Sequence, residues 1–266
     1  MINQDFKELV WQQGPELYRE MPWRQDTRPY YVLVSELMLQ QTQVDRVVPK
    51  FKDFIAAFPN EQSLADASLS DVLKLWQGLG YNRRAKFLHD AAKKVVTEFD
   101  NKFPNSYDTL IQLPGVGKNT AGAILAYSFN QPSLFIETNI RTVYLHHFFP
   151  GGEIVDDKEI VKLLQATLDT EHPREWYWAL MDYGSFLKRS GQGRIHQSRQ
   201  YKKQSPLKGS VREVRGQIVK LLTTQELSHD QLSMQLTADG RFEQALAGLI
   251  QHGLVTITNN KLHLTK

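Results

Sequence analysis

Glu36 is an acidic residue whose surroundings suit proton transfer. It lies inside YYVLVSELMLQQ, where its neighbours are mostly apolar. Burial among apolar side chains disfavours an ionised carboxylate, so we expect the pKa of Glu36 to be raised and the group to hold a proton near neutral pH. Such a group is a candidate general acid. The alternative is that Glu36, Gln40 and Gln43 form the polar stripe of an amphipathic helix.

Glu137 is a second acidic candidate, and its position favours the opposite charge state. It lies in FIETNIRTV, just before a predicted helix. The positive end of a helix dipole stabilises a carboxylate as the anion. An anion held there could face positive charge that develops on a substrate, but the same residue could be a simple helix cap. The residues alone leave both roles open.

A glycine-containing turn links two predicted helices within LPGVGKNTAGAIL. The Leu-Pro pair ends one helix, Gly115 and Gly117 permit a positive φ, and Lys118 begins the next helix. Such a turn exposes backbone N–H groups to a phosphate oxygen, and glycine lets a nucleic-acid backbone approach closely. The alternative is an ordinary helix-helix turn. The predicted DNA-binding residues of this turn are Gly115, Val116, Gly117 and Lys118, and they would contact phosphates without reading sequence.

Positive charge is concentrated between Lys188 and Arg215. Nine basic residues and one acidic residue, Glu213, occur in this stretch. The plainest interpretation is a solvated linker, yet a linker this basic would still be attracted to a polyanion. The basic residues are Lys188, Arg189, Arg194, Arg199, Lys202, Lys203, Lys208, Arg212 and Arg215.

The elements that must position these side chains are predicted to be helices. Apolar residues recur at helical spacing through almost all of the first two hundred residues, without convincing alternation. One predicted helix ends near Pro49 and resumes to Phe58, and another is capped by Ser68 or Ser70. We therefore predict an all-α domain. Its further helices are predicted in RRAKFLHDAAKKVVTEF, SYDTLIQL, KNTAGAILAYSF, NIRTVYLHHFF, DKEIVKLLQATL and PREWYWALMDYGSFLKR.

The sequence changes character after the basic stretch. Three helices are predicted in VREVRGQIVKLLTTQ, SHDQLSMQL and RFEQALAGLIQHG, the second capped by Ser228. VTITNNKLHLT then alternates on both sides of Asn259-Asn260, which predicts a β-hairpin. We expect a small winged-helix-like module, of a kind that binds either DNA or other proteins. The predicted organisation is a helical core at 1–187, a basic segment at 188–208 and this module at 209–266.

Composition excludes several classes of site. The chain has 266 residues, a net charge of +3 and no cysteine, so disulfides, thiolate metal sites and a cysteine nucleophile are excluded. No apolar run approaches the ~20 residues that cross a bilayer, and the N-terminus has no signal-peptide pattern. We expect a cytoplasmic protein that does not bind a membrane. We expect no metal at His146-His147, which lack acidic or histidine partners at ligand spacing.

Five separate blocks of the sequence together resemble one family. LPGVGKNTAGAIL, SELMLQQTQV, LWQGLGYNRRAKFLH, ETNIRTV and ALMDYG are similar to the helix-hairpin-helix (HhH-GPD) DNA glycosylases and, within them, to the MutY adenine glycosylases. The resemblance runs from about Met21 to Lys188. It implies two helical subdomains with the active site between them. It also implies a base excision repair enzyme that acts, as a monomer, on double-stranded DNA containing a mispaired or damaged base, so a nucleoid-associated location follows.

The resemblance implies roles for both acids. Glu36 falls on the acid that protonates adenine, and Asn139 matches an asparagine of the same motif as Glu137. Glu137 stands where the family has aspartate, which is shorter by one methylene or about 1.5 Å. Family members that also cut the strand carry a lysine at the position of Asn119. We therefore expect a monofunctional glycosylase, without AP-lyase activity, that leaves an abasic site.

Further residues carry over by position. Tyr81 matches a tyrosine that wedges into the duplex, and its place on a glycine-containing turn beside Arg83 and Arg84 suits such insertion, although core packing is the alternative. Gln41 matches an inserted glutamine. The residues predicted for the base pocket are Arg19, Arg24, Asn119 and Asp182, of which Asp182 would contact the base. The other predicted DNA-binding residues are Gln41, Tyr81, Arg83, Arg84, Lys188 and Arg189.

The sequence departs from the family at two places. The four cysteines of an iron-sulfur cluster are absent, so we expect no cofactor, and basic residues from Lys188 onward could contact DNA instead. We expect the small module, whose partner the sequence does not identify, in place of the family's Nudix-like C-terminal domain, which recognises 8-oxoguanine. The predicted target is adenine opposite 8-oxoguanine or guanine. The alternatives are a thymine or uracil mismatch glycosylase and a non-catalytic DNA-binding protein.

Overall fold

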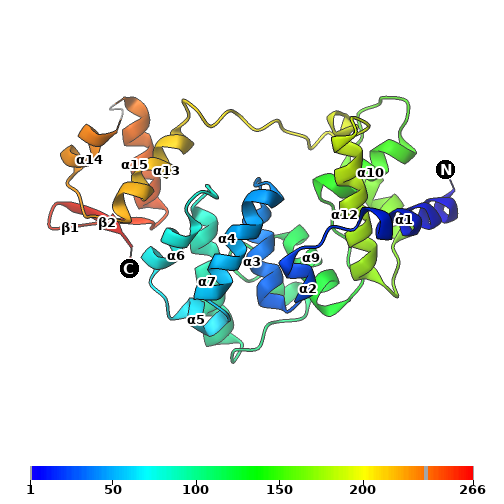
Figure 1. The fold of residues 1–266 in the computed structure, drawn as a ribbon, viewed down its shortest axis with the longest axis horizontal. Coiled ribbons are helices and arrows are strands. Elements are labelled where there is room, and N and C mark those ends of the chain that lie inside the picture. Colours follow the sequence, from blue (N-terminus) through cyan, green and yellow to red (C-terminus); the bar gives the residue numbers. More distant parts are fainter. Residues whose placement is uncertain (1, 237–238, 266) are drawn as a thin grey trace. The chain divides into compact units, whose positions relative to one another are not determined.

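The computed structural model describes residues 2–236 and 239–265, and helices dominate the described chain (Figure 1). The chain divides into two compact units. Unit 1 comprises Met1–Val32, Asn105–Gln112 and Val116–Lys203. Unit 2 comprises Leu33–Pro104, Leu113–Gly115 and Gln204–Lys266. The chain passes from the first unit into the second within α3, Pro29–Leu39. The predicted all-α character of the first two hundred residues is confirmed.

Unit 1 is organised around the long helix α12, which packs against α1, α9 and α10. Its core is aromatic: Phe6 and Trp176 are both fully buried, with ring centroids 6.3 Å apart. Burial of these large rings contributes to the apolar area that stabilises the unit. The helices are α1 (Asn3–Leu17), α2 (Pro22–Gln25), α8 (Tyr107–Leu110), α9 (Lys118–Phe129), α10 (Thr138–Phe148), α11 (Asp157–Thr167) and α12 (Pro173–Arg189), with a 3-10 turn at Ile195–Gln197.

In unit 2, helix α7 packs against both α5 and α6. Its helices before the basic segment are α4 (Val44–Ala57), α5 (Glu61–Ala65), α6 (Leu69–Trp76) and α7 (Arg83–Glu98). The side chain of Ser68 accepts a hydrogen bond from the Asp71 N–H, so the predicted cap of α6 is Ser68. Phe54 and Trp76 are fully buried between these helices.

The C-terminal module belongs to unit 2 and has the predicted elements. They are α13 (Val211–Leu222), α14 (His229–Gln235), α15 (Gly240–Gln251), β1 (Val255–Thr258) and β2 (Lys261–Leu264). The strands pair antiparallel, with Val255 opposite Leu264. Asn259 and Asn260 have φ of 51° and 57°, the left-handed pair that a two-residue hairpin turn needs. The Gln77 amide donates to the Thr223 hydroxyl at 2.8 Å and joins the module to α6.

The predicted helix break at Pro49 is wrong. Pro49 lies inside α4, and the break falls instead at residues 40–43, between α3 and α4. Gln41 has a φ of 57°, which no α-helix accommodates. Pro49 is exposed and lies past the first turn of α4, so its ring removes one hydrogen bond of the helix interior without ending the helix.

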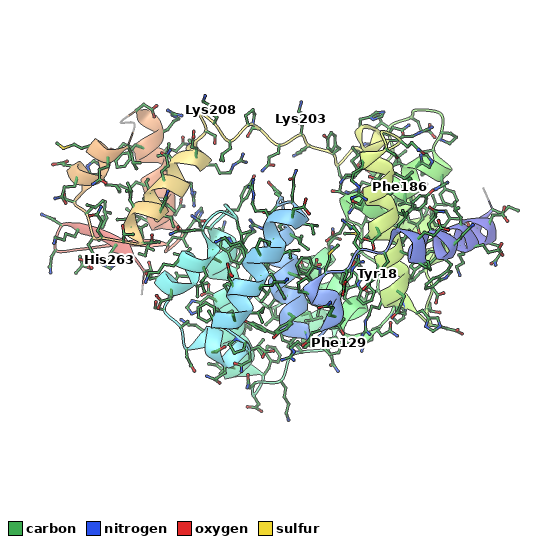
Figure 2. The ribbon with its side chains drawn as sticks, in the orientation of Figure 1. Tyr18, Phe129, Phe186, Lys203, Lys208 and His263 are labelled. Carbon is green, nitrogen blue, oxygen red and sulfur yellow. The ribbon has the colours of Figure 1, made fainter. Side chains whose placement is uncertain are left out.

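The basic segment has little regular structure. Residues 201–206 form neither helix nor strand, and the side chains of Lys203 and Lys208 project from the backbone here (Figure 2). No helix in the described ranges has the length and apolar character needed to span a membrane.

Candidate functional site

Glu36 is a half-buried carboxyl on a helix that is otherwise almost wholly buried. Ser35, Leu37 and Met38, its neighbours on α3, are at most 1% exposed. Gln40 and Gln43 lie beyond the end of the helix, in the turn before α4. The alternative of a polar helical stripe is therefore wrong. Glu36 instead interrupts an apolar helix, and a buried polar group in such a place calls for a role.

Glu137 occupies the N-cap position of α10, where it is half-buried. Its side chain makes no capping hydrogen bond, so Glu137 is not a simple helix cap. The carboxylate is nonetheless close to the first turn of an 11-residue helix, whose dipole favours the anion.

Asn119 fixes the backbone immediately before Glu137. Its Nδ2 donates to the Ile136 carbonyl oxygen at 2.8 Å, and the Ile136 N–H donates to its Oδ1 at 3.4 Å. The side chain thus spans from the start of α9 to the segment that carries the acid. Asn119 was predicted to line a base pocket, which stays a prediction, and in the structure its amide anchors the backbone of Ile136, next to Glu137.

Asn139, two residues after Glu137, contacts α12. Its Oδ1 accepts a hydrogen bond from Lys188 Nζ at 3.0 Å. Although Lys188 is exposed overall, partial desolvation of its ammonium group and the charge of Arg19 both lower its pKa. At Gly184, a Cβ would lie 2.1 Å from the Asn139 carbonyl oxygen, so only glycine permits this approach of α12 to α10.

Asp182 is buried between two arginines. It is 1% exposed, and its four hydrogen bonds come from Arg19 N and Nε and from Arg24 Nη1 and Nη2, at 2.6 to 3.1 Å. Two carboxylate oxygens offer about four acceptor positions, so none remains. The predicted contact of Asp182 with a base is therefore wrong. Asp182 positions the arginines, and Arg24 lies 5.2 Å from the centroid of Tyr18 and 5.3 Å from that of Trp178.

The glycine-containing turn has one glycine with positive φ. Gly115 has a φ of +79°, and a Cβ there would come within 2.8 Å of Phe87 Cβ. Gly117 has a φ of −90°, so of the two glycines that permit a positive φ only Gly115 adopts one. Gly117 is the N-cap of α9, and a Cβ there would meet nothing within 4 Å. That open space suits close approach of a ligand to the exposed N–H groups. The Val116 side chain is 6% exposed, which leaves its backbone as the group able to make a contact, while Lys118 is exposed.

Tyr81 and Gln41 lie in unit 2 and share one polar partner. Tyr81 has a φ of 49° and follows Gly80, whose φ is +69°. The Gln204 amide Nε2 contacts both the Tyr81 hydroxyl and Gln41 Oε1, at 2.5 and 3.3 Å. Tyr81 is half-buried and Gln41 is exposed. The alternative of a core tyrosine is therefore wrong, and both side chains remain candidates for insertion into DNA.

The two neighbouring arginines at the start of α7 have different surroundings. Arg83 is exposed and lies 4.8 Å from the centroid of Phe87. Arg84 is 7% exposed and donates to the carbonyl oxygens of Leu37, Met38, Leu79 and Gly80. Burial lowers the pKa of Arg84 to about 10. The prediction that Arg84 binds DNA is wrong, because its guanidinium joins the end of α3 to the turn before α7.

The segment that follows α12 is held by a hydrogen bond, a short bridge and an ion pair. Arg194 Nη1 donates to the Pro150 carbonyl oxygen at 2.7 Å, Val155 and Ser198 form a parallel bridge, and Arg199 pairs with Asp156 at 3.4 Å. Because this chain has no cysteine, its residues do not fit an iron-sulfur cluster. Lys188 and Arg189 end α12 and are exposed.

Comparison with known proteins identifies relatives of this chain. Residues 34–168 match the family described as HhH-GPD superfamily base excision DNA repair protein. The chain is 40% identical over 173 residues to the adenine DNA glycosylase of Buchnera aphidicola subsp. Baizongia pistaciae, an alignment that covers 64% of this chain and 48% of the relative. The adenine DNA glycosylase of Mycobacterium tuberculosis (strain ATCC 25618 / H37Rv) is 30% identical over 273 residues, covering 94% and 89%. The chain thus spans about half the length of the Buchnera relatives that it matches.

Solved structures with a similar fold are also known. A thermostable thymine-DNA glycosylase is 22% identical and superposes with a TM-score of 0.66 over 72% of this chain and 90% of that one. An endonuclease III-DNA covalent intermediate is 17% identical, with a TM-score of 0.61 over 77% of this chain and 91% of that one. At these identities the likeness concerns the fold alone, and the fold class expected from the sequence motifs is confirmed.

Proposed function

Because this chain belongs to the HhH-GPD superfamily of base excision DNA repair proteins, we propose that it is a monofunctional DNA glycosylase acting on double-stranded DNA. Its proposed substrate is adenine mispaired with 8-oxoguanine or guanine. The names of the relatives at 30 to 40% identity support adenine as the target. The observation that carries the proposal is Glu36, a half-buried carboxyl flanked on α3 by the fully buried Ser35 and Leu37.

In the proposed reaction Glu36 is the general acid. It donates a proton to a ring nitrogen of adenine, and the glycosidic bond then breaks with its electron pair moving to the departing base. The sugar becomes oxocarbenium-like, and its positive charge is stabilised by the Glu137 carboxylate. Water supplies the hydroxyl that adds to the anomeric carbon, and its proton passes to a carboxylate. The products are free adenine and an abasic site.

Hydrogen bonds from neighbouring side chains hold the residues on either side of Glu137. Asn119 holds the Ile136 backbone beside Glu137, and Lys188 holds Asn139 in the first turn of α10. An asparagine amide at position 119 cannot form the Schiff base that strand cleavage by a lyase requires, because it is not a nucleophilic amine. The proposal therefore ends at the abasic site and uses no cofactor.

DNA contacts are proposed for the turn at Gly115–Lys118, for Arg83, and for Lys188 and Arg189. Gln41 and Tyr81 are proposed to enter the duplex when the base is flipped out. We propose that the protein acts as a monomer in the cytoplasm, associated with the nucleoid, because its substrate would be chromosomal DNA.

A panel of duplexes tests the proposed function. The protein is incubated with duplexes that contain A:8-oxoG, A:G, T:G or U:G pairs, and alkali then cleaves any abasic site. We expect cleavage of the adenine-containing strand in the first two duplexes and none without alkali. Cleavage only at thymine or uracil would show that the target is one of these bases and not adenine. Binding without cleavage of any duplex would contradict the enzymatic proposal.

A further inference from the structure

A cavity of about 530 Å³ lies within unit 2, beside the turn that precedes α7. Its walls come from that turn, from the first part of α13 and from the residue after α15. This volume is within the range of sites for small ligands and is large enough for a nucleotide. The residues used in the argument are Tyr81, Arg83, Arg212, Arg215, Gly216 and His252.

The charge on the cavity wall is not balanced. Arg83, Arg212 and Arg215 make no ion pair within 4.0 Å in residues 2–236 and 239–265, and Arg212 and Arg215 are half-buried whereas Arg83 is exposed. Buried or half-buried charges are normally paired, because the loss of hydration is costly. The three guanidinium groups converge on one cavity without a protein anion.

Contacts within the wall show how closely the positive charges gather. Arg215 Nη2 donates to His252 Nδ1 at 2.9 Å, so the ring is neutral and presents Nε2–H as a donor. Burial and the nearby charge of Arg83 lower the pKa of Arg215. Burial, then Arg215 and Arg83, lower the pKa of His252. An anion in the cavity would relieve this repulsion.

Two glycines in helix interiors make room for the arrangement. At Gly248 on α15, a Cβ would come within 2.9 Å of Arg215 Nη1, so the glycine lets that side chain cross the helix. At Gly216 on α13, a Cβ would meet nothing within 4 Å, and the open space is the cavity itself. Glycine is a poor helix former, and the fold alone does not require it at 216.

We propose that this cavity binds one nucleotide of a DNA strand, with its phosphate held by Arg83, Arg212 and Arg215. The C-terminal module would thereby form part of the DNA-binding surface. The guanidinium groups supply charge-assisted hydrogen bonds to phosphate oxygens. The Tyr81 hydroxyl accepts a hydrogen bond from Arg212 Nη1 at 2.5 Å and so holds that side chain at the cavity. The identity of the ligand as DNA rests on the proposed function.

The salt dependence of DNA binding tests the proposal. Fluorescence anisotropy with a labelled A:8-oxoG duplex is measured over a salt series for the full chain in a Glu36→Gln background, which prevents turnover. Each lost phosphate contact lowers the slope of log K against log salt by about 0.9. We expect this decrease for both Arg83→Gln and Arg215→Gln. Arg241→Gln is the matched control, because Arg241 is in the same module but pairs with Asp239, and its slope should equal that of the parent.

Two glycine variants give an independent measurement. Gly216→Leu should place its side chain in the cavity and weaken duplex binding about tenfold, whereas Gly216→Ala should leave binding nearly unchanged. Should Gly216→Leu fail to fold, the arginine variants still decide the matter. Parental slopes for both Arg83→Gln and Arg215→Gln would overturn the proposal.

Calorimetry with deoxyadenosine monophosphate separates a DNA strand from a free nucleotide as the ligand. Binding of the mononucleotide that Arg215→Gln abolishes, together with an unchanged duplex slope, would assign the cavity to a free nucleotide and overturn the proposal. The proposed enzymatic function is read out separately as adenine release with Glu36 intact. A changed slope without any release by the parent protein would reject that function and keep the cavity as a DNA contact.

Discussion

Arg24 Nη1 lies 2.6 Å from Asp182 Oδ2, and the two residues form an ion pair whose side chains are 4% and 1% exposed. Removal of one member of a buried pair leaves the other without a counter-charge, at a cost of about 3–5 kcal/mol. We expect Asp182→Asn to lower the free energy of unfolding by about 3 kcal/mol, measured by urea titration. Asp26→Asn breaks an exposed pair with Arg28 and should cost at most about 1 kcal/mol. Equal losses in the two variants would show that burial of the Arg24 pair is unimportant.

Glu36→Gln should abolish base release while DNA binding is kept. A glutamine amide has nearly the size of the carboxyl group but cannot give up a proton, and loss of a general acid lowers rates by about 100- to 10,000-fold. Single-turnover release of adenine measures the rate, and anisotropy measures binding. Glu98→Gln, on the exposed end of α7, is the control and should match the parent protein. Retention of the full rate by Glu36→Gln would remove Glu36 from the mechanism.

Glu137→Asp tests whether the local backbone is fitted to the longer acid. Asn119 fixes the segment before Glu137, so the shorter side chain should leave its carboxylate displaced by about 1 Å, which lowers rates by about 100-fold. The measurement is single-turnover release at saturating DNA, with urea titration to show that stability is unchanged. An aspartate variant as fast as the parent would indicate that the length of the acid is not set by the anchor at Asn119.

His147 should make unit 1 sensitive to acid. Its Nε2 lies 2.8 Å from the Tyr183 hydroxyl, and burial together with His146 lowers its pKa from 6.5 to about 4. His147 is therefore protonated at a lower pH in the folded state than in the unfolded state. The stability contributed by the neutral ring is present above about pH 6.5 and is lost as pH falls toward 4. Urea titrations at pH 7 and pH 4.5 should show a smaller loss for His147→Gln than for the parent.

His229→Gln is the control for this comparison. The His229 ring donates hydrogen bonds to Asp230 and Glu243, which raise its pKa, so its protonation favours the folded state and that contribution is lost as pH rises. Its removal should not reduce the loss of stability at low pH. A parent-like loss at pH 4.5 in His147→Gln would place the acid sensitivity elsewhere.

Local patterns predicted the elements well because their signals are local. Ser68 and Ser228 cap helices as predicted, since a hydroxyl three residues before a backbone N–H needs no distant partner. The two-residue turn at Asn259-Asn260 was recognisable for the same reason. The break between α3 and α4 was predicted at the wrong place. Glutamine is not a residue type that indicates a left-handed backbone, so the conformation of Gln41 could not be predicted, whereas a proline such as Pro49 usually indicates a helix end.

Distant pairing was not predictable in the same way. Asp182 and Arg19 are 163 residues apart, and nothing in either stretch shows that the carboxylate is saturated. Arg84 carried a usable signal that was missed: it lies four residues before Leu88 on the buried face of α7, with Ala85 and His89 beside it. The cavity near Arg215 required knowledge of how α13 lies beside the turn before α7, which no motif encodes.

The contact between Gly184 and the Asn139 carbonyl oxygen has a consequence for mutational tolerance. A single added methyl group on α12 would force the first turn of α10 outward and carry the neighbouring acid with it. In a saturation library scored by the mutation rate of its host, codon 184, which encodes a buried residue, should therefore accept glycine alone. A Cβ at Gly240 would meet no atom within 4 Å, so codon 240 should accept alanine.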